Sequence, residues 1–367
     1  MSFNRSIVLM FSVVSILLCG ASPVKQKSGD TIVLRDEKID FTPKEFYIAD
    51  VADGRKDGRS VASLISINPD HSSTVKQADL KDGAMVSIRN FIARNLQRDN
   101  SLRPVVLTIK EFKLTETKLT DGTISGRLVV VFSFALQLNY YTVHLVDFTG
   151  GIRYARSDNQ SVDTETILRQ GIEGVVSDFN KWINANAGTN ATLAKSVKVH
   201  FTDYTEKPEG DTIYYSIDRP LTWDDFKDKP RDDRFAAEIL TSIGYIQQNE
   251  VLKGVIHINM AIKVNVAKSD CWVKEGAKDN YALNHEQRHF DIEKLVGEHF
   301  KQKISAMDLP VDNFNGTMSV EYFETLREAT RMQKQYDIET RHGQDRQAQA
   351  EWNEKIDKEL RLYGLKK

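Results

Sequence analysis

The chain has 367 residues, enough for two domains that each bury a hydrophobic core. Its 50 basic and 52 acidic residues nearly cancel, and 28% of its residues are charged while 40% are hydrophobic, which is the composition of a globular protein. Nucleic acid is not an expected ligand, because the sequence has no block of lysine and arginine with interleaved aromatic residues that would neutralise phosphates.

The N-terminal segment has the pattern of a secretory signal peptide. Arg5 precedes an apolar run at residues 7–19, and small residues follow at 20–22. The run is shorter than the roughly 20 residues that span a bilayer, and no later stretch is comparable. We therefore expect export to the periplasm or the cell exterior, without a transmembrane segment.

Two processing routes fit this segment. Cleavage after Ala21 would remove residues 1–21, whereas cleavage before Cys19 would attach lipid to that cysteine and give an outer-membrane lipoprotein. Leu18 disfavours the second route, because a small residue is preferred in front of a lipidated cysteine. Since Cys271 is the one other cysteine, no disulfide is expected to hold the exported fold.

The first predicted domain, residues 30–205, has the pattern of an α+β layer. A helix is indicated by apolar residues at three- and four-residue steps from Met85 to Leu96, and a second helix is expected at about 164–187. Segments rich in β-branched and aromatic residues predict an antiparallel sheet that these helices cover, with strands at 31–34, 46–51, 105–114, 126–148 and 151–157.

The second predicted domain, residues 208–367, is also α+β, with a small sheet followed by long helices. Strands are expected at 212–217, 235–246 and 255–266. Helices are expected at about 280–307, 319–341 and 344–362.

The sequence NHEQRHFDIEKL at residues 284–295 places two histidines four positions apart, with a glutamate directly after the first. In a helix, His285 and His289 lie on one face, so both imidazoles can reach one ion. Zinc is the expected cofactor, because it prefers such nitrogens and three protein ligands leave a fourth position for water. Glu286 would flank that water as the catalytic base. The alternative is a pair of buried histidines without metal, at a cost of roughly 1–3 kcal/mol for each unpaired ring.

A third ligand is expected from the following helix. If the helices on either side of residues 308–318 pack antiparallel, the HExxH motif faces residues 335–341. Two candidates stand in or beside this window. His342 offers the imidazole that zinc favours, while Glu339 fits the mirrored level but lies on the flank of the helix's apolar stripe.

Two further residues of this window have expected roles near the metal. Asp337 would orient a ligating imidazole. Tyr336 would either donate a hydrogen bond to the developing oxyanion, as a catalytic residue, or pack as a core aromatic.

Five segments of the second domain share their motifs with a known family. They are LTWDDFKDKP (221–230), FAAEILTSIGY (235–245), CWVK (271–274), LNHEQRHFDI (283–292) and YDIETRHG (336–343). These segments resemble the bacterial family of predicted secreted zinc-dependent proteases known as domain of unknown function 922. The resemblance covers about residues 210–365, and Arg288 and Cys271 depart from it, because glycine and serine are usual there. It implies a zincin-like peptidase domain with the same metal site.

The expected function is that of an exported zinc metallopeptidase. Its partner would be a peptide or protein substrate in the cell envelope or outside the cell, and residues 255–266 would line the cleft and pair with an extended peptide. One alternative is an envelope binding protein in which a metal staples two helices without catalysis. A second is hydrolysis of a non-peptide amide in cell-wall material, which would use the same residues.

Overall fold

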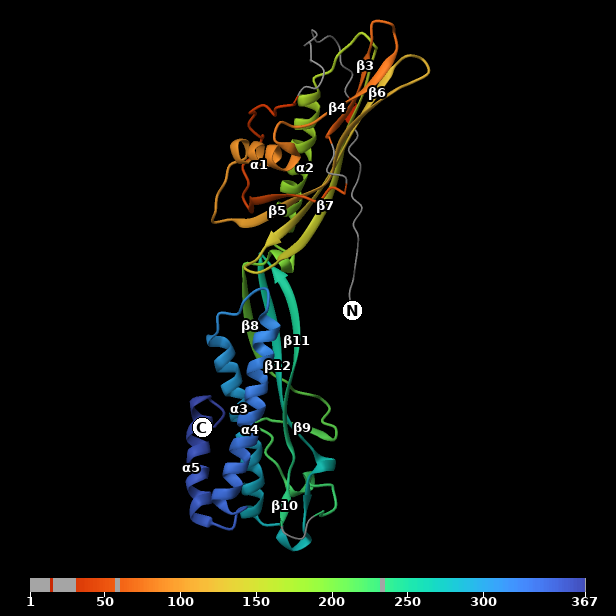
Figure 1. The fold of residues 1–367 in the computed structure, drawn as a ribbon. Helices are drawn as coiled ribbons and strands as arrows, with labels where there is room; N and C mark the ends of the chain where they lie inside the picture. Colours follow the sequence, from red (N-terminus) through yellow and green to blue (C-terminus); the bar gives the residue numbers. More distant parts are fainter. Residues whose placement is uncertain (1–13, 16–30, 57–59, 232–234, 367) are drawn as a thin grey trace. The chain divides into compact units, whose positions relative to one another are not determined.

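The computed structural model describes residues 14–15, 31–56, 60–231 and 235–366 (Figure 1). They form two compact units that divide between Ala187 and Gly188, and both units are α+β as the sequence predicts. Most of the expected signal peptide, with Cys19, lies outside the described residues, and Val14–Ser15 (β1) pairs in parallel with β7 (Thr142–Arg156). Within the described residues, no helix combines the length and apolar character that crossing a bilayer requires.

The first unit is a mixed sheet covered by two helices. β5 (Arg103–Lys118), β6 (Ile124–Gln137) and β7 form an antiparallel meander. The sheet departs from the antiparallel prediction, because β2 (Phe46–Asp53) and β3 (Ala62–Ile67) both pair with β5 in parallel, and β3 forms a hairpin with β4 (Ser73–Ala78).

Aromatic packing holds the helices on this sheet. α1 (Gly83–Asn95) packs against β2, and α2 (Thr164–Asn186) packs against β6 and β7. The ring of Phe179 on α2 stacks on Phe134 at 4.0 Å between centroids and meets Phe46 edge-on at 4.8 Å. All three rings are fully buried, so they form the centre of the first core.

The second unit begins before β8 (Ser196–Asp203), a strand that the sequence analysis left in the first domain. β8 belongs here because it pairs in parallel with β12 (Val255–Ala267). β12 is the central strand, with β11 (Thr241–Leu252) antiparallel on one side and β8 and β9 (Thr212–Tyr214) on the other. A separate two-stranded sheet joins β10 (Ala237–Glu238) to β13 (Trp272–Val273).

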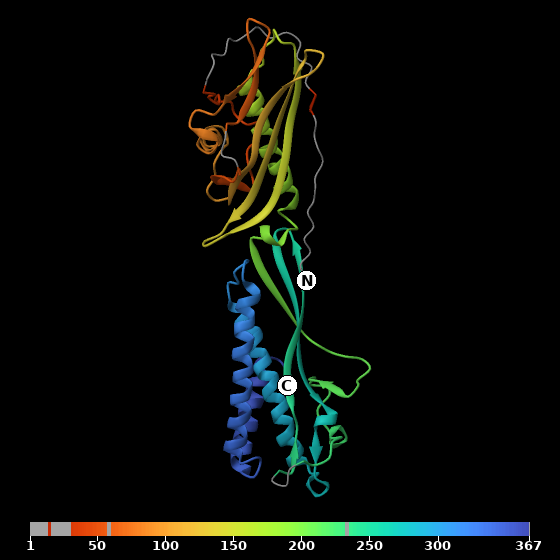
Figure 2. The same cartoon turned by 45° about the vertical axis from the view of Figure 1, so that its right-hand side comes forward.

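Three long helices lie on one side of the larger sheet, as the two views show (Figures 1 and 2). They are α3 (Asn280–Ala306), α4 (Phe314–Thr340) and α5 (Arg346–Leu362), at the positions that the sequence predicts within a few residues. Of the three, α3 is the one that packs most closely on the sheet. Phe290 and Phe300 on α3 pack into the sheet's apolar face, while Ile292 and Leu295 pack against α4 and α5. Short 3₁₀ turns lie at Ala191–Leu193, Trp223–Asp225, Lys268–Asp270 and Glu275–Ala277.

Candidate metal centre

The two histidines of the HExxH motif lie near the start of α3. Asp279 caps this helix, since its carboxylate accepts a hydrogen bond from the amide of Ala282, and the motif follows within two turns. His285 and His289 therefore occupy one face of a regular helix, and their side chains are 9% and 14% exposed. That face is turned toward α4.

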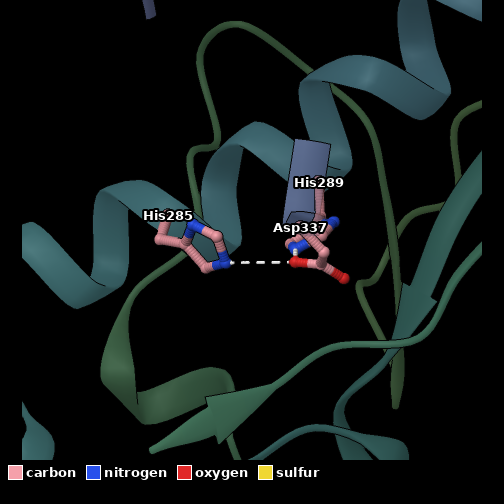
Figure 3. A group of neighbouring side chains, drawn as sticks. All are labelled: His285, His289 and Asp337. Atoms are coloured by element: carbon pink, nitrogen blue, oxygen red, sulfur yellow. Dashed lines mark ion pairs between the residues drawn. The ribbon is translucent and has the colours of Figure 1, made fainter. Parts of the chain in front are cut away.

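Asp337 on α4 completes a group of three potential ligands (Figure 3). Its Oδ1 lies 3.1 Å from Nε2 of His289 and 3.5 Å from Nε2 of His285. Four ligands placed tetrahedrally at zinc's usual 2.0–2.1 Å are about 3.3 Å apart, so these separations fit the edges of such a site. The same Oδ1 is buried and accepts no hydrogen bond from any described residue, as expected for an atom that bonds to a cation.

Two glutamines hold the histidines in the orientation that ligation needs. Nδ1 of His285 lies 2.9 Å from Oε1 of Gln349, and Nδ1 of His289 lies 2.6 Å from Oε1 of Gln333. The Nε2 atoms of both glutamines donate hydrogen bonds to other groups. Each glutamine Oε1 is therefore the acceptor toward its histidine, and each histidine Nδ1 carries the proton. Both histidine Nε2 atoms then face Asp337, where each offers a lone pair when its ring is neutral and a proton when its ring is protonated.

The charges of the group favour a cation. Burial opposes ionisation of Asp337, but the imidazoles of His285 and His289 outweigh it and hold the pKa of Asp337 far below its ordinary value. Burial would lower the pKa of His289, yet Asp337 and Glu286 outweigh that effect and raise it. An ionised carboxylate beside two imidazoles is a donor set that suits zinc.

Glu286 lies beside these ligands in a pocket of about 610 Å³. Its side chain is almost completely buried, and this burial raises its pKa above the ordinary value, although the two histidines act in the opposite direction. A carboxylate with a raised pKa is suited to accept and release a proton near neutral pH. Residues 235–241 form the opposite wall of the pocket.

His342 reaches the site from the turn between α4 and α5. Arg341, His342 and Gly343 all have left-handed backbone conformations, with φ of 51°, 53° and 75°. This turn brings Nδ1 of His342 to 3.4 Å from Oδ1 of Asp337, with the side chain 46% exposed in the pocket wall. His342 is near the cluster but is not one of the three residues whose ligand atoms converge.

The other two expected site residues have different surroundings. Glu339 is exposed, and its carboxylate accepts hydrogen bonds from Nε1 of Trp352 at 2.7 Å and from Gln335, so the structure does not bring it to the histidines. The reason is its position on α4, two residues and therefore about 200° from Asp337.

Tyr336 is fully buried behind the histidines rather than in the pocket. Its hydroxyl donates to the main-chain oxygen of His285 at 3.3 Å and accepts from Gln349, while its ring stacks on His285. Its surroundings are those of the core alternative, and its hydroxyl is not among the groups that line the pocket.

One expectation about the cleft is also corrected. β12 does not line the pocket, because strands occupy both of its edges and it lies within the sheet. Arg288, which departs from the family pattern, is 6% exposed and binds Asp357 and Asn353 of α5 at 2.5 and 2.9 Å. It therefore joins α3 to α5 and is not among the residues that line the pocket.

Neither the glutamines nor the ligand position of Asp337 was predicted from the sequence. Gln333 precedes Asp337 by one helical turn and so lies on the same face of α4, which is a signal that spacing alone provides. Gln349 lies on α5, and its role depends on how that helix is aligned with α3, which no local pattern encodes.

Comparison with known proteins adds no family assignment. No family model and no curated protein matches this chain. Among solved structures, the crystal structure of protein XCC0632 from Xanthomonas campestris, of the family model DUF330, shares 10% sequence identity. The match covers 42% of this chain and 91% of that protein at a TM-score of 0.26, a likeness too low to support any argument.

Proposed function

We propose that the second unit is a zinc-dependent peptidase and that the chain is exported. The observation that carries this proposal is the convergence of His285, His289 and Asp337 around a buried carboxylate oxygen without a hydrogen bond, with Glu286 beside them in an open pocket. The motifs that resemble the domain of unknown function 922 support the same activity. The signal-like segment at residues 1–21 supports export.

The residues present fit a zinc ion as its ligands. His285 and His289 would hold it through Nε2 and Asp337 through Oδ1, while Gln349 and Gln333 fix the two rings from behind. When bound, zinc supplies Lewis-acid chemistry that polarises a peptide carbonyl.

Glu286 performs the proton transfers of the proposed reaction. It takes a proton from the attacking water and later gives it to the leaving amine. Burial raises the pKa of the Glu286 carboxyl above its ordinary value, which favours the acceptance of a proton, although His289 and His285 act in the opposite direction.

The first prediction concerns Glu286→Gln. This substitution keeps the shape of the side chain but removes the base, so we expect about one zinc per chain to be retained while peptide hydrolysis falls by a factor of about 10² to 10⁴. Metal content is measured by elemental analysis and hydrolysis with internally quenched peptides. Glu275→Gln, at a side chain that is 94% exposed, is the matched control and should keep full activity. Undiminished cleavage by the Glu286→Gln protein would refute the assigned role.

The second prediction concerns the third ligand. Asp337→Asn should lose most of its zinc, because a neutral amide replaces the carboxylate, whereas Glu339→Gln should bind zinc as the wild type does. His342→Ala should weaken binding less than Asp337→Asn. The comparison is made by titration against a competing chelator, and zinc affinity that depends on Glu339 but not on Asp337 would overturn the assignment.

A further inference from the structure

β10 forms the part of the pocket wall that faces the metal ligands and has a free edge. Ala237 pairs with Val273 and Glu238 with Trp272, and β10 pairs with no other strand of the described residues. One edge of β10 is thus unoccupied.

The register of this pair shows which backbone groups face the free edge. The amide of Lys274 donates to the oxygen of Ala236 at 2.9 Å, so residues 236 and 274 form a hydrogen-bonded pair of the antiparallel ladder. Such pairs alternate along a ladder, which makes Glu238 and Trp272 the next one. The N–H and C=O groups of Ala237 therefore point away from β13.

The free edge belongs to the pocket. Residues 235–241 line it continuously, opposite His285, Glu286 and His289. A peptide in extended conformation that added to this edge would run along the pocket wall with its backbone held by Ala237. The peptide bond to be cut would then lie between the strand and α3.

The charge of the pocket lining indicates which substrate side chains the pocket favours. Glu238, Glu286 and Asp337 contribute carboxylates, and no lysine or arginine is found among the described residues that line the pocket. Glu238 is fixed in place, since Nε1 of the buried Trp272 donates to its Oε2 at 2.9 Å. The same wall includes the apolar residues Phe235, Ile239 and Leu240, and Leu240 is 50% exposed.

We infer that β10 binds the substrate as an added strand and that Glu238 makes the site selective for extended peptides with basic or apolar residues beside the cleaved bond, and against acidic ones. This inference rests on the proposed peptidase function. The physical cause is twofold. Main-chain pairing requires an extended segment, and an acidic side chain would be placed beside Glu238, the carboxylate of the described lining that neither holds the proposed zinc nor transfers the proton, with no lysine or arginine of that lining to offset it.

The first test measures main-chain pairing with the full-length Glu286→Gln protein loaded with zinc. Short alanine- and leucine-rich peptides are methylated at one backbone nitrogen at a time, and binding is followed by fluorescence anisotropy. We expect methylation to weaken binding about tenfold at alternate positions only, because alternate amides face the strand. Equal losses at every position, or none, would overturn strand addition.

The second test measures charge selection with zinc-loaded protein and internally quenched peptides that carry lysine or glutamate next to the cleaved bond. Wild type should prefer the lysine peptide, and Glu238→Lys should shift the ratio of the two kcat/KM values at least about tenfold toward the glutamate peptide. Glu275→Lys, the same charge change outside the pocket, should leave the ratio unchanged.

The outcomes separate this inference from the proposed function. If peptides are cut but the ratio does not respond to Glu238→Lys, the selectivity inference fails and the peptidase stands. If the zinc-loaded wild type cuts neither peptide and the Glu286→Gln protein binds neither, both the proposed peptidase function and this inference fail.

Discussion

At the residue scale, the site depends on groups that never touch a substrate. Gln333 accepts a hydrogen bond from Nδ1 of His289 and donates to the main-chain oxygen of the same residue and to Glu293. Gln349 likewise accepts a hydrogen bond from Nδ1 of His285, and its side-chain amide donates to Tyr336 and Asn353. Each imidazole is thus fixed in rotation and tautomer before any ion arrives, which lowers the entropy lost on binding.

This arrangement predicts the effect of Gln333→Leu. The substitution leaves Nδ1 of His289 without an acceptor and frees the ring, so we expect zinc affinity to fall by about 10- to 100-fold with little change in fold. The affinity is measured by competition with a fluorescent zinc indicator. Gln335→Leu is the matched control, because Gln335 is exposed on the same helix and bonds to Glu339. Equal affinities for the two variants would show that Gln333 does not support the site.

At the element scale, the helices and central strands could be predicted from the sequence, but the strands that pair with one another could not. Apolar periodicity marks α3, α5 and β12 to within a few residues, because each buries one face and that face is visible in the spacing. The single strand expected at 235–246 is divided into β10 and the start of β11, and no strand was predicted at β8. β10 has two residues, and β8 is defined by parallel pairing with a strand more than fifty positions later, which local pattern does not record.

The same limit applied to the site. The HExxH motif is local, so its face and its glutamate were predictable. The choice among Asp337, Glu339 and His342 depended on the rotation of α4 about its own axis and on the left-handed turn that follows it. Neither is fixed by helical spacing to better than one residue, and one residue turns a side chain by about 100°.

An ion pair between elements gives a prediction about pH. Asp203 at the end of β8 binds Lys294 and Lys301 of α3 at 2.7 and 2.6 Å. Burial would raise the pKa of Asp203, but the two lysines outweigh it and hold the pKa below its ordinary 3.8. A depressed carboxyl pKa stabilises the folded state above the unfolded-state value, and this contribution is lost as the pH falls through the folded-state value.

We therefore expect Asp203→Asn to lower the free energy of unfolding at neutral pH by roughly 1 kcal/mol, a modest figure because the Asp203 side chain is 41% exposed and solvent screens it. Urea denaturation of both proteins at several pH values measures the difference. It should shrink once the pH is taken below 3.8. A difference that stays constant with pH would mean that charge is not its cause.

At the scale of the whole molecule, the two units have separate cores. The aromatic cluster around Phe179 involves residues of the first unit alone, while the clusters around Phe290 and Tyr336 involve residues of the second. The proposed ligands and the glutamines that hold them all belong to the second unit. Zinc should therefore affect the stability of one unit and not the other.

Calorimetry of the full chain tests this expectation. With zinc at about a thousand times its dissociation constant, binding should stabilise the second unit by about 4 kcal/mol, and chelation should remove that gain while the transition of the first unit stays in place. Tryptophan fluorescence assigns the transitions when Trp182 in α2 is replaced by phenylalanine. If chelation lowered the transition temperatures of both units equally, zinc would not stabilise the second unit alone, and the expectation would be contradicted.

The short connection between the two ligand-bearing helices bears on the order of folding. α3 and α4 are joined by residues 307–313 alone, so their packing can begin between neighbours at the turn and extend toward His285, His289 and Asp337, whereas β8 and β12 pair in parallel and every pair of partners is 59 positions apart. Contacts between neighbours along the chain generally form sooner than contacts between distant segments. The nascent helical hairpin can thus capture its cation before the sheet is complete, and zinc would act as a nucleus for assembly as well as a reagent for hydrolysis.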